Sequence, residues 1–252
     1  MPKLIEFVNI DKAFKTHKIL DNLNLSINQG DLIGLIGKSG EGKTTLLRVL
    51  IGFYKIDSGS IIFKDKDITK KTSLIRDVVG FCTQDNSFYP ELSIEENLFY
   101  YGRLYKIKRR KLKQTISKLL DLVDLTNHKK KLAGRISGGM KRRLDFAISL
   151  VHEPEILILD EPTTGLDPII RKSIWDLIDK INKDGTTIIV SSHLLDFIQE
   201  KCNKIGILNK GDVQIYTMQT LKKRYPKAKN LNYMFEMAVK QGLAKGKLTK
   251  IK

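Results

Sequence analysis

Eight residues near the start of the chain have the types and spacing of a loop that binds phosphate. They fit the pattern G-x-x-x-x-G-K-[ST] and read Gly37-Lys38-Ser39-Gly40-Glu41-Gly42-Lys43-Thr44. Glycine tolerates backbone conformations that other residues avoid, so the loop can turn successive N–H groups toward an anion. By itself the pattern predicts a site for a nucleoside triphosphate.

The flanking residues must form a strand and a helix for this loop to work. The apolar run 32–36 predicts a buried strand before it, and residues 45–50 predict a helix after it. The N-terminus of that helix adds a partial positive charge at the loop. We therefore expect Lys43 to reach the β- and γ-phosphates and the Thr44 hydroxyl to ligate Mg²⁺. A glycine turn that binds nothing is the alternative, but it does not account for a complete match in this context.

Two carboxylates follow a second apolar strand, which is predicted over 156–159. Asp160 and Glu161 stand at its carboxyl end, where parallel sheets of α/β proteins bind their ligands. Asp160 is placed to hold Mg²⁺, directly or through water. Glu161 is the candidate general base, because that role needs a carboxylate near the γ-phosphate but off the metal. Two acids can also end a strand merely for solubility, but the phosphate loop favours the catalytic interpretation.

A third element, Ser137-Gly138-Gly139, stands at the start of a helix predicted over about 139–152. A hydroxyl and bare N–H groups at a helix start can clamp a phosphate. Because the chain already has one such loop, a second suggests that the nucleotide is shared between two molecules. Taken alone, the three residues are also an ordinary turn.

Along the chain stand, in this order, the phosphate loop, Gln84, Ser137-Gly138-Gly139, Asp160-Glu161, Gly165-Leu166-Asp167 and His193. In types and order these motifs resemble those of an ATP-binding cassette (ABC) ATPase. The resemblance covers about residues 4 to 216, and small GTPases, kinases and helicases lack the Ser-Gly-Gly helix. It implies a P-loop NTPase core of the α/β class with a mostly parallel sheet, a small antiparallel β subdomain and an inserted helical subdomain. It also implies that ATP is bound and hydrolysed with Mg²⁺.

The resemblance implies roles for single residues on the nucleotide side. Phe14 matches the aromatic ring that stacks on adenine, and a core phenylalanine is the alternative. Gln84 matches a glutamine that senses Mg²⁺ and the γ-phosphate, and His193 matches a switch histidine that contacts the γ-phosphate. Glu161, His193, Gln84 and Lys43 are thus the expected catalytic residues, Thr44, Gln84 and Asp160 the expected metal site, and Gly37 to Thr45 the expected ATP cradle, with Lys38, Ser39, Glu41 and Thr45 included.

Other implied roles concern a partner. Ser137, Gly138 and Gly139 match the signature that clamps the partner subunit's ATP, and Asp167 matches an aspartate at the dimer interface. Two signature positions depart from the family pattern, because Ile136 replaces a leucine and Met140 replaces a glutamine. The second change removes a polar contact. The implied catalytic unit is a head-to-tail dimer, with itself or with a paired ABC ATPase subunit.

Residues 140–144 and 165–168 resemble the ATPase subunits of drug, antibiotic and lipid exporters of the daunorubicin-resistance type. The chain of 252 residues has 41% hydrophobic content and no apolar run near the ~18 residues that span a bilayer. We therefore expect a cytoplasmic protein, peripheral on the membrane face, whose transmembrane permease is a separate subunit. Residues 1–11 lack a signal peptide, and Cys82 and Cys202 predict reduced, buried thiols.

The net charge of +17 is concentrated in two regions. Residues 101–145 have 15 Lys and Arg against 3 Asp and Glu, and residues 218–252 have 10 against 1. An anionic membrane surface or nucleic acid would explain this, and so would lysine-rich solvated helices. The rival function is a soluble ABC ATPase that acts on nucleic acid or ribosomes. It fits less well, because such factors usually have two cassettes in one chain.

Seven of the 19 aromatic residues lie between residues 81 and 105. In ABC ATPases, the cleft after the glutamine loop receives a helix of the membrane subunit, so an aromatic cluster there suits a partner groove. The rings can equally fill the core of a helical lobe. The residues are Phe81, Phe88, Tyr89, Phe99, Tyr100, Tyr101 and Tyr105.

The remaining patterns predict the order of elements and the domain limits. Alternating residues at 22–28 predict a strand of an antiparallel sheet, and residues 4–8 predict another. Residues 57–60 predict a turn, 93–96 a capping box, and 209–212 a hairpin. We expect an ATPase domain over 1–217 with a helical insertion at about 86–135, then a basic helical extension over 218–252. The last residues, 242–252, are expected to be frayed.

Overall fold

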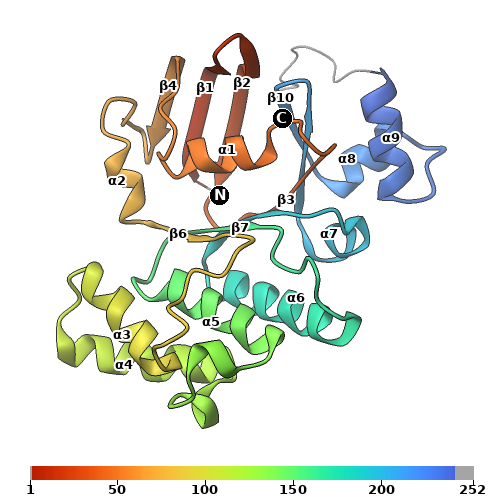
Figure 1. Cartoon of the computed structure of the whole chain (residues 1–252). Coiled ribbons are helices and arrows are strands. Elements are labelled where there is room, and N and C mark those ends of the chain that lie inside the picture. Colours follow the sequence, from red (N-terminus) through yellow and green to blue (C-terminus); the bar gives the residue numbers. More distant parts are fainter. Residues whose placement is uncertain (1, 242–252) are drawn as a thin grey trace.

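The computed structural model describes residues 2–241, and its centre is a six-stranded sheet (Figure 1). The strand order is β10-β9-β3-β8-β7-β6, and every neighbouring pair is parallel except β9 and β10. This is the mostly parallel sheet that the sequence predicted. Its strands are β3 (Leu32–Gly37), β6 (Val79–Cys82), β7 (Ile156–Asp160), β8 (Thr187–Ser191), β9 (Lys204–Asn209) and β10 (Asp212–Tyr216).

A second sheet is antiparallel, in the order β2-β1-β4-β5. The predicted strand at 4–8 extends to Phe14, because register shifts against β2 interrupt the regular alternation without ending the strand. The predicted turn at 57–60 was wrong, since Ser58 already begins a strand. Gly59, with φ 96°, accommodates the bulge there, and a Cβ on it would lie 2.4 Å from the Asn9 carbonyl oxygen. The strands are β1 (Lys3–Phe14), β2 (His17–Asn28), β4 (Ser58–Phe63) and β5 (Lys66–Asp67).

The two faces of the central sheet belong to different cores because side chains alternate along each strand. In β7, Ile156 and Ile158 face the core shared with the antiparallel sheet and with α1 (Lys43–Leu50). Leu157 and Leu159 face the core built with α5, α6 and α7. The molecule is thus layered, with the parallel sheet between an antiparallel sheet and a layer of helices, as Figure 1 shows.

Four longer helices form the lower part of the molecule in Figure 1. The predicted capping box of α3 is confirmed, since Ser93 and Glu96 cap each other's backbone N–H. Pro168 occupies the first turn of α6, where its missing N–H is not needed, and Asp167 caps the helix. The helices are α3 (Ile94–Leu104), α4 (Arg109–Leu122), α5 (Gly138–Leu150) and α6 (Pro168–Lys183), with short 3₁₀ turns at 126–128 and 133–135. The short helix α2 (Ser73–Arg76) lies in the upper part, beside the antiparallel sheet.

The C-terminal part packs onto the core rather than standing apart from it. The predicted hairpin is confirmed, with Lys210 and Gly211 at positive φ between β9 and β10. After it come α8 (Met218–Arg224) and α9 (Leu231–Gln241), and α9 packs on α7 (Leu195–Lys201) through buried Leu231 and Met234. The predicted frayed end, 242–252, lies outside the described residues.

Two further predictions concern thiols and membrane spans. Cys82 and Cys202 are free and buried, as predicted, and burial raises the pKa of Cys82 to about 12. Within residues 2–241, no helix combines the length and the apolar character that crossing a bilayer requires.

Candidate nucleotide-binding and hydrolysis site

The phosphate loop leaves the carboxyl end of β3 and enters α1, as the sequence predicted. Gly40 and Gly42 have φ 80° and 102°, the left-handed region that favours glycine. A Cβ on Gly42 would also lie 2.6 Å from the Ile19 side chain. No side chain caps α1 at Gly42, so the N–H groups of its first turn are free for an anion. The open part of the loop is exposed at Lys38, Ser39, Gly40 and Thr44.

Lys43 spans the loop from its buried base. Its ammonium group donates hydrogen bonds to the Gly37 carbonyl at 2.8 Å and to the Lys38 carbonyl at 3.1 Å. Burial lowers the pKa of Lys43, and the negative charges of Glu161, Asp160 and Glu41 oppose that shift. The lysine is therefore held at the loop by carbonyl oxygens, at the place where the pattern predicts a phosphate.

A hydrogen-bonded chain joins the loop to the carboxylates. The Thr44 hydroxyl donates to Asp160 Oδ2 at 3.0 Å, and the Ser191 hydroxyl donates to Asp160 Oδ1 at 2.6 Å. The register of β7 against β8 produces this second contact, since Asp160 pairs with Ser191. A hydroxyl and a carboxylate are hard oxygen ligands, so Thr44 and Asp160 suit Mg²⁺. Ser191 was not among the predicted site residues, although it ends the strand beside Asp160.

Glu161 leaves β7 with φ 49°, an uncommon conformation for a non-glycine residue. Ser191 holds this turn, because its hydroxyl and its carbonyl oxygen accept from the Glu161 N–H at 3.0 and 3.2 Å. The Glu161 carboxylate accepts from the Thr164 hydroxyl through Oε2 at 3.1 Å. Backbone strain of this kind often occurs at functional sites, where the surroundings fix one orientation.

His193 and Glu161, two of the expected catalytic residues, lie beside each other. His193 Nε2 is 3.0 Å from Glu161 Oε1, but this oxygen has no partner with hydrogen-bond geometry among the described residues. The His193 side chain is 58% exposed and Glu161 is 12% exposed. Glu161 Oε1 is therefore buried against the His193 ring, close enough for a charge interaction when the histidine is protonated.

Gln84 and the signature residues Ser137, Gly138 and Gly139 form no hydrogen bond to Thr44 or Asp160 in the described chain. Gln84 lines a pocket of 180 Å³ with Gly138 and Thr164. Ser137 caps α5 by accepting from the Met140 N–H at 3.3 Å, and Gly138 has open space where a Cβ would stand. Contacts within the described chain therefore connect Thr44, Asp160, Glu161 and His193, with Lys43 close enough to feel both carboxylates. Gln84 and Gly138 adjoin this set through the pocket that they share with Thr164, the residue that donates to Glu161.

Three other predicted residues have contacts that fix their position. Asp167 is exposed and accepts from the N–H groups of Ile169 and Ile170, both at 3.0 Å. Glu41 accepts from the Lys210 N–H at 2.7 Å, which ties the loop to the β9–β10 hairpin. Phe14 is 40% exposed, so the alternative of a core phenylalanine is wrong. Its ring meets Tyr54 edge-on at 5.0 Å.

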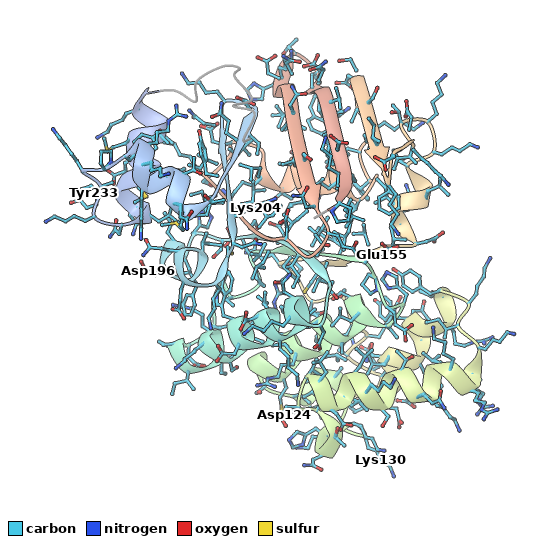
Figure 2. All side chains as sticks on the ribbon, turned by 180° about the vertical axis from the view of Figure 1, so that it is seen from behind. Asp124, Lys130, Glu155, Asp196, Lys204 and Tyr233 are labelled. Carbon is cyan, nitrogen blue, oxygen red and sulfur yellow. The ribbon has the colours of Figure 1, made fainter. Side chains whose placement is uncertain are left out.

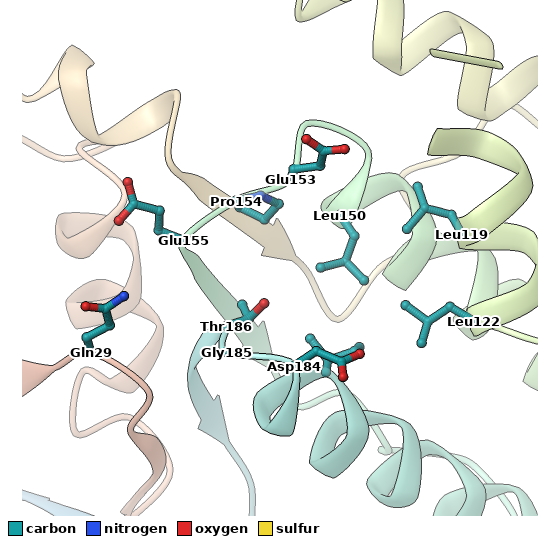
Figure 3. A pocket seen from close by; sticks show the side chains of 11 residues that line it. Gln29, Leu119, Leu122, Leu150, Glu153, Pro154, Glu155, Asp184, Gly185 and Thr186 are labelled. Atoms are coloured by element: carbon teal, nitrogen blue, oxygen red, sulfur yellow. The ribbon is translucent and has the colours of Figure 1, made fainter. Parts of the chain in front are cut away.

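A larger pocket of 510 Å³ opens at the opposite ends of the strands, away from the phosphate loop (Figure 3). Glu153 and Glu155 line it just before β7 begins, and Gly185 and Thr186 line it just before β8 begins. It thus lies at the amino ends of the strands, whereas the phosphate loop and Asp160 lie at the carboxyl ends. Ligands of parallel sheets bind at the carboxyl ends, so the chemistry of the residues, not the size of a hollow, identifies the site.

A phosphate loop after one strand, with a carboxylate at the end of the strand two places away in the same parallel sheet, defines a P-loop nucleotide hydrolase. Comparison with known families matches residues 20–164 to the ABC transporter family, which is more than half of the chain. The chain belongs to the ABC transporter family, as one of its ATP-binding, ATP-hydrolysing subunits.

Individual relatives agree with this assignment. The chain is 38% identical over 213 residues to the bacitracin transport ATP-binding protein BcrA of Bacillus licheniformis, covering 84% of this chain and 68% of BcrA. It is 34% identical over 210 residues to the linearmycin resistance ATP-binding protein LnrL of Bacillus subtilis, covering 83% and 68%.

Solved structures share the fold. The ADP conformation of MJ1267, an ATP-binding cassette of an ABC transporter, has a TM-score of 0.81 at 25% identity over 92% of this chain and 98% of that one. The protein cbiO1 of Clostridium perfringens, part of the ABC transporter complex cbiONQ, has a TM-score of 0.80 at 25% identity, covering 94% and 99%.

Proposed function

We propose that this chain powers the export of a small molecule by hydrolysing ATP as one half of a dimer bound to a separate membrane permease. The observation that carries the proposal is the linked set of Thr44, Asp160, Ser191 and Glu161, with His193 at 3.0 Å from Glu161. The relatives are named for bacitracin transport, linearmycin resistance and Nod factor export, which favours transport over the nucleic-acid rival.

In the proposed mechanism, the P-loop and Lys43 hold the phosphates and Glu161 accepts a proton from the attacking water. Glu161 is assigned this role because it follows Asp160 at the carboxyl end of β7 and its carboxylate is close enough to the P-loop to oppose the lowering of the Lys43 pKa by burial. Thr44 and Asp160 would hold Mg²⁺, which supplies positive charge to the phosphates. In this proposal His193, whose Nε2 is 3.0 Å from Glu161 Oε1, contacts the γ-phosphate and orients Glu161.

The dimer is proposed because the signature faces outward. Ser137 and Gly138 are exposed, and no hydrogen bond in the described chain connects them to residues 37–44. A nucleotide at the P-loop of one copy therefore needs a second copy to supply Ser137, Gly138 and Gly139. Asp167 at the exposed N-terminus of α6 would contribute to the same interface.

The proposed permease contact is the exposed part of the aromatic cluster. Phe88, Phe99 and Tyr101 pack against the core, but Tyr89, Tyr100 and Tyr105 are 40–44% exposed. The Tyr89 and Tyr100 rings meet edge-on at 4.8 Å. Tyrosines of this kind suit a partner surface, since each presents an apolar ring and a polar tip.

The proposed membrane surface is the basic region between residues 101 and 145. Arg109, Arg110, Lys113 and Lys118 are exposed along α4, and Figure 2 shows Lys130 at the bottom of the molecule. We further propose the domain limits 1–217, with the helical insertion at 86–135, and 218–252. Helices α3 and α4 fall in that insertion, and α8 and α9 fall in the extension.

A direct test compares Glu161→Gln with Glu155→Gln, a matched change at the other end of β7. The Glu155 carboxylate forms an ion pair with Lys64 at the surface, 2.7 Å away. We expect E161Q to bind ATP normally while its turnover falls about 10²–10⁴-fold, the usual cost of losing a general base. E155Q should turn over like the wild type. Turnover of E161Q at the wild-type rate would contradict the assignment of the base.

A further inference from the structure

Arg142 of α5 connects two loops that end neighbouring strands of the parallel sheet. Its Nε donates to the Pro162 carbonyl at 2.7 Å and Nη1 to the Thr83 carbonyl at 2.6 Å. Longer contacts of 3.5 Å reach the carbonyl oxygens of Gln84 and Glu161. The side chain is only 7% exposed. One guanidinium group thus satisfies carbonyls of the segment with Gln84 and of the segment with Glu161.

The same helix fastens the Gln84 segment at its other end. Asp145, which is 1% exposed, accepts from the Ser87 N–H and from the Ser87 hydroxyl through Oδ1, both at 2.9 Å. Its Oδ2 lies 4.0 Å from Arg142 Nη1. The Tyr101 hydroxyl of α3 also donates to the Ser87 carbonyl. Residues 83 to 87 are therefore held to α5 at both ends, and to α3 through Tyr101.

The chemistry of the side chain explains why an arginine is needed. Its planar group presents five N–H donors, so it can serve carbonyls in two directions at once. A lysine offers one nitrogen and cannot span them. Strand β6 pairs with β7 up to Cys82 and Leu159, and the carbonyls that Arg142 reaches lie just beyond that pairing. The guanidinium replaces the sheet as the connection between the two segments.

We propose that Arg142 is a positioning residue for ATP hydrolysis that aligns Glu161 and Gln84 with each other through their backbones. The proposal rests on the function proposed above for those two residues. Because the connection starts from α5, the helix that Ser137 caps, a shift of α5 moves the Glu161 and Gln84 segments together. Contact of the partner subunit with Ser137, Gly138 and Gly139 would then shift the backbone of Glu161 through α5 and Arg142.

The test compares Arg142→Gln with Arg143→Gln, the neighbouring arginine of the same helix. Arg143 donates to the Val123 carbonyl at 2.7 Å and to the Ser173 hydroxyl at 3.5 Å, and neither lies in the Gln84 or Glu161 segment. Both changes remove a guanidinium that serves a backbone carbonyl, so both should lower Tm by similar amounts. We expect R142Q alone to reduce kcat, by about one to two orders of magnitude, because small misplacements of catalytic groups cost that much.

The affinity for ATP distinguishes a positioning role of Arg142 from a general loss of structure in the variant. The dissociation constant for ATP, measured without hydrolysis, should stay within about threefold of the wild type in R142Q, because Arg142 touches no residue of the P-loop. Arg142→Lys keeps the charge if R142Q does not fold, and it should also lose turnover. The proposal is overturned if R142Q or R142K turns over like R143Q, or if kcat and ATP affinity fall in parallel.

The Glu161→Gln variant in the same series separates this inference from the proposed function. If E161Q is inactive while R142Q and R142K turn over normally, only the role of Arg142 is wrong. If E161Q itself turns over normally, the assigned base is wrong whatever Arg142 does.

Discussion

The Thr44 hydroxyl lies 3.0 Å from Asp160 Oδ2, although 116 positions separate the two residues in the chain. Thr44 is the second residue of α1, the helix that follows the P-loop. Asp160 ends β7, which lies two strands away from β3 in the sheet. The second oxygen of Asp160 accepts from Ser191, which also holds the backbone of Glu161. A single carboxylate therefore links the Thr44 hydroxyl, the proposed metal ligand, to Glu161, the proposed general base, through one serine.

Ser191→Ala should slow hydrolysis without weakening nucleotide binding in the absence of Mg²⁺. The change removes a hydrogen bond to the Asp160 carboxylate, and bonds of this type contribute about 1.5–3 kcal/mol. We expect kcat to fall about tenfold and the Mg²⁺ concentration at half-maximal rate to rise, as measured by steady-state ATPase assays. Ser149→Ala is the control, because Ser149 is also buried but donates only to the Phe146 carbonyl. An unchanged Mg²⁺ requirement in S191A would be inconsistent with this role.

Phe14→Ala should weaken binding of ATP about five- to a hundredfold, because base–aromatic stacking contributes about 1–3 kcal/mol. Phe14 stands against Tyr54, whose hydroxyl accepts from Arg48 of α1 at 3.1 Å. Calorimetric titration with ATP and with inorganic triphosphate separates the contribution of the base. Triphosphate should bind F14A as well as it binds the wild type.

Phe53→Ala is the matched control for that experiment. Phe53 is 65% exposed and meets Tyr54 at 5.1 Å, but its ring has no contact with Phe14 in the described structure. Equal losses of ATP affinity in F14A and F53A would show that Phe14 does not stack on adenine.

Local patterns predicted those parts of the structure that depend on neighbours in the sequence. The Ser93–Glu96 capping box and the hairpin at Lys210-Gly211 both formed as predicted. Each depends on backbone conformation and hydrogen bonds within a few residues. The P-loop belongs to the same group, because glycine spacing fixes its shape.

The features that the sequence did not predict depend on pairing between distant segments. Ser58 and Gly59 looked like a turn, and only the bulged pairing of β4 with β1 makes them strand residues. Ser191 gained its role because the register places it opposite Asp160. Nothing in the helical pattern of α5 indicates that Arg142 reaches the Thr83 and Pro162 carbonyls, which are 59 and 20 positions away.

Reversing charge on α4 should weaken attachment to anionic liposomes. The variant replaces Lys108, Arg109, Arg110 and Lys113 with Glu, and it leaves Lys111 intact because Lys111 pairs with Glu153 at 2.7 Å. Each basic residue near an anionic surface contributes about 1 kcal/mol, and salt screens it over about 8 Å at physiological ionic strength. Cosedimentation should therefore fall strongly at low salt and little at ~0.5 M salt, while basal ATPase activity stays unchanged.

Four exposed lysines of the C-terminal part, Lys222, Lys223, Lys227 and Lys229, give a control with the same change in net charge. If both variants lose attachment equally, total charge governs binding and α4 has no special role. If the α4 variant loses RNA binding instead, the nucleic-acid rival gains support.

The central claim, that two copies share each ATP, is tested most directly by mixing two inactive variants. Ser137→Arg should abolish hydrolysis, because it blocks the signature offered to the partner, while its own P-loop still binds ATP. Lys43→Ala should abolish hydrolysis by weakening phosphate binding at its own P-loop. In a mixed dimer, the intact P-loop of the S137R copy faces the intact signature of the K43A copy, so one complete site forms.

The measurement is the ATPase rate of the mixture against each variant alone, with mixed dimers quantified through two different affinity tags. We predict that the mixture recovers activity in proportion to the mixed dimers present, while each variant alone stays inactive. Mixed dimers that form and remain inactive would contradict the shared site.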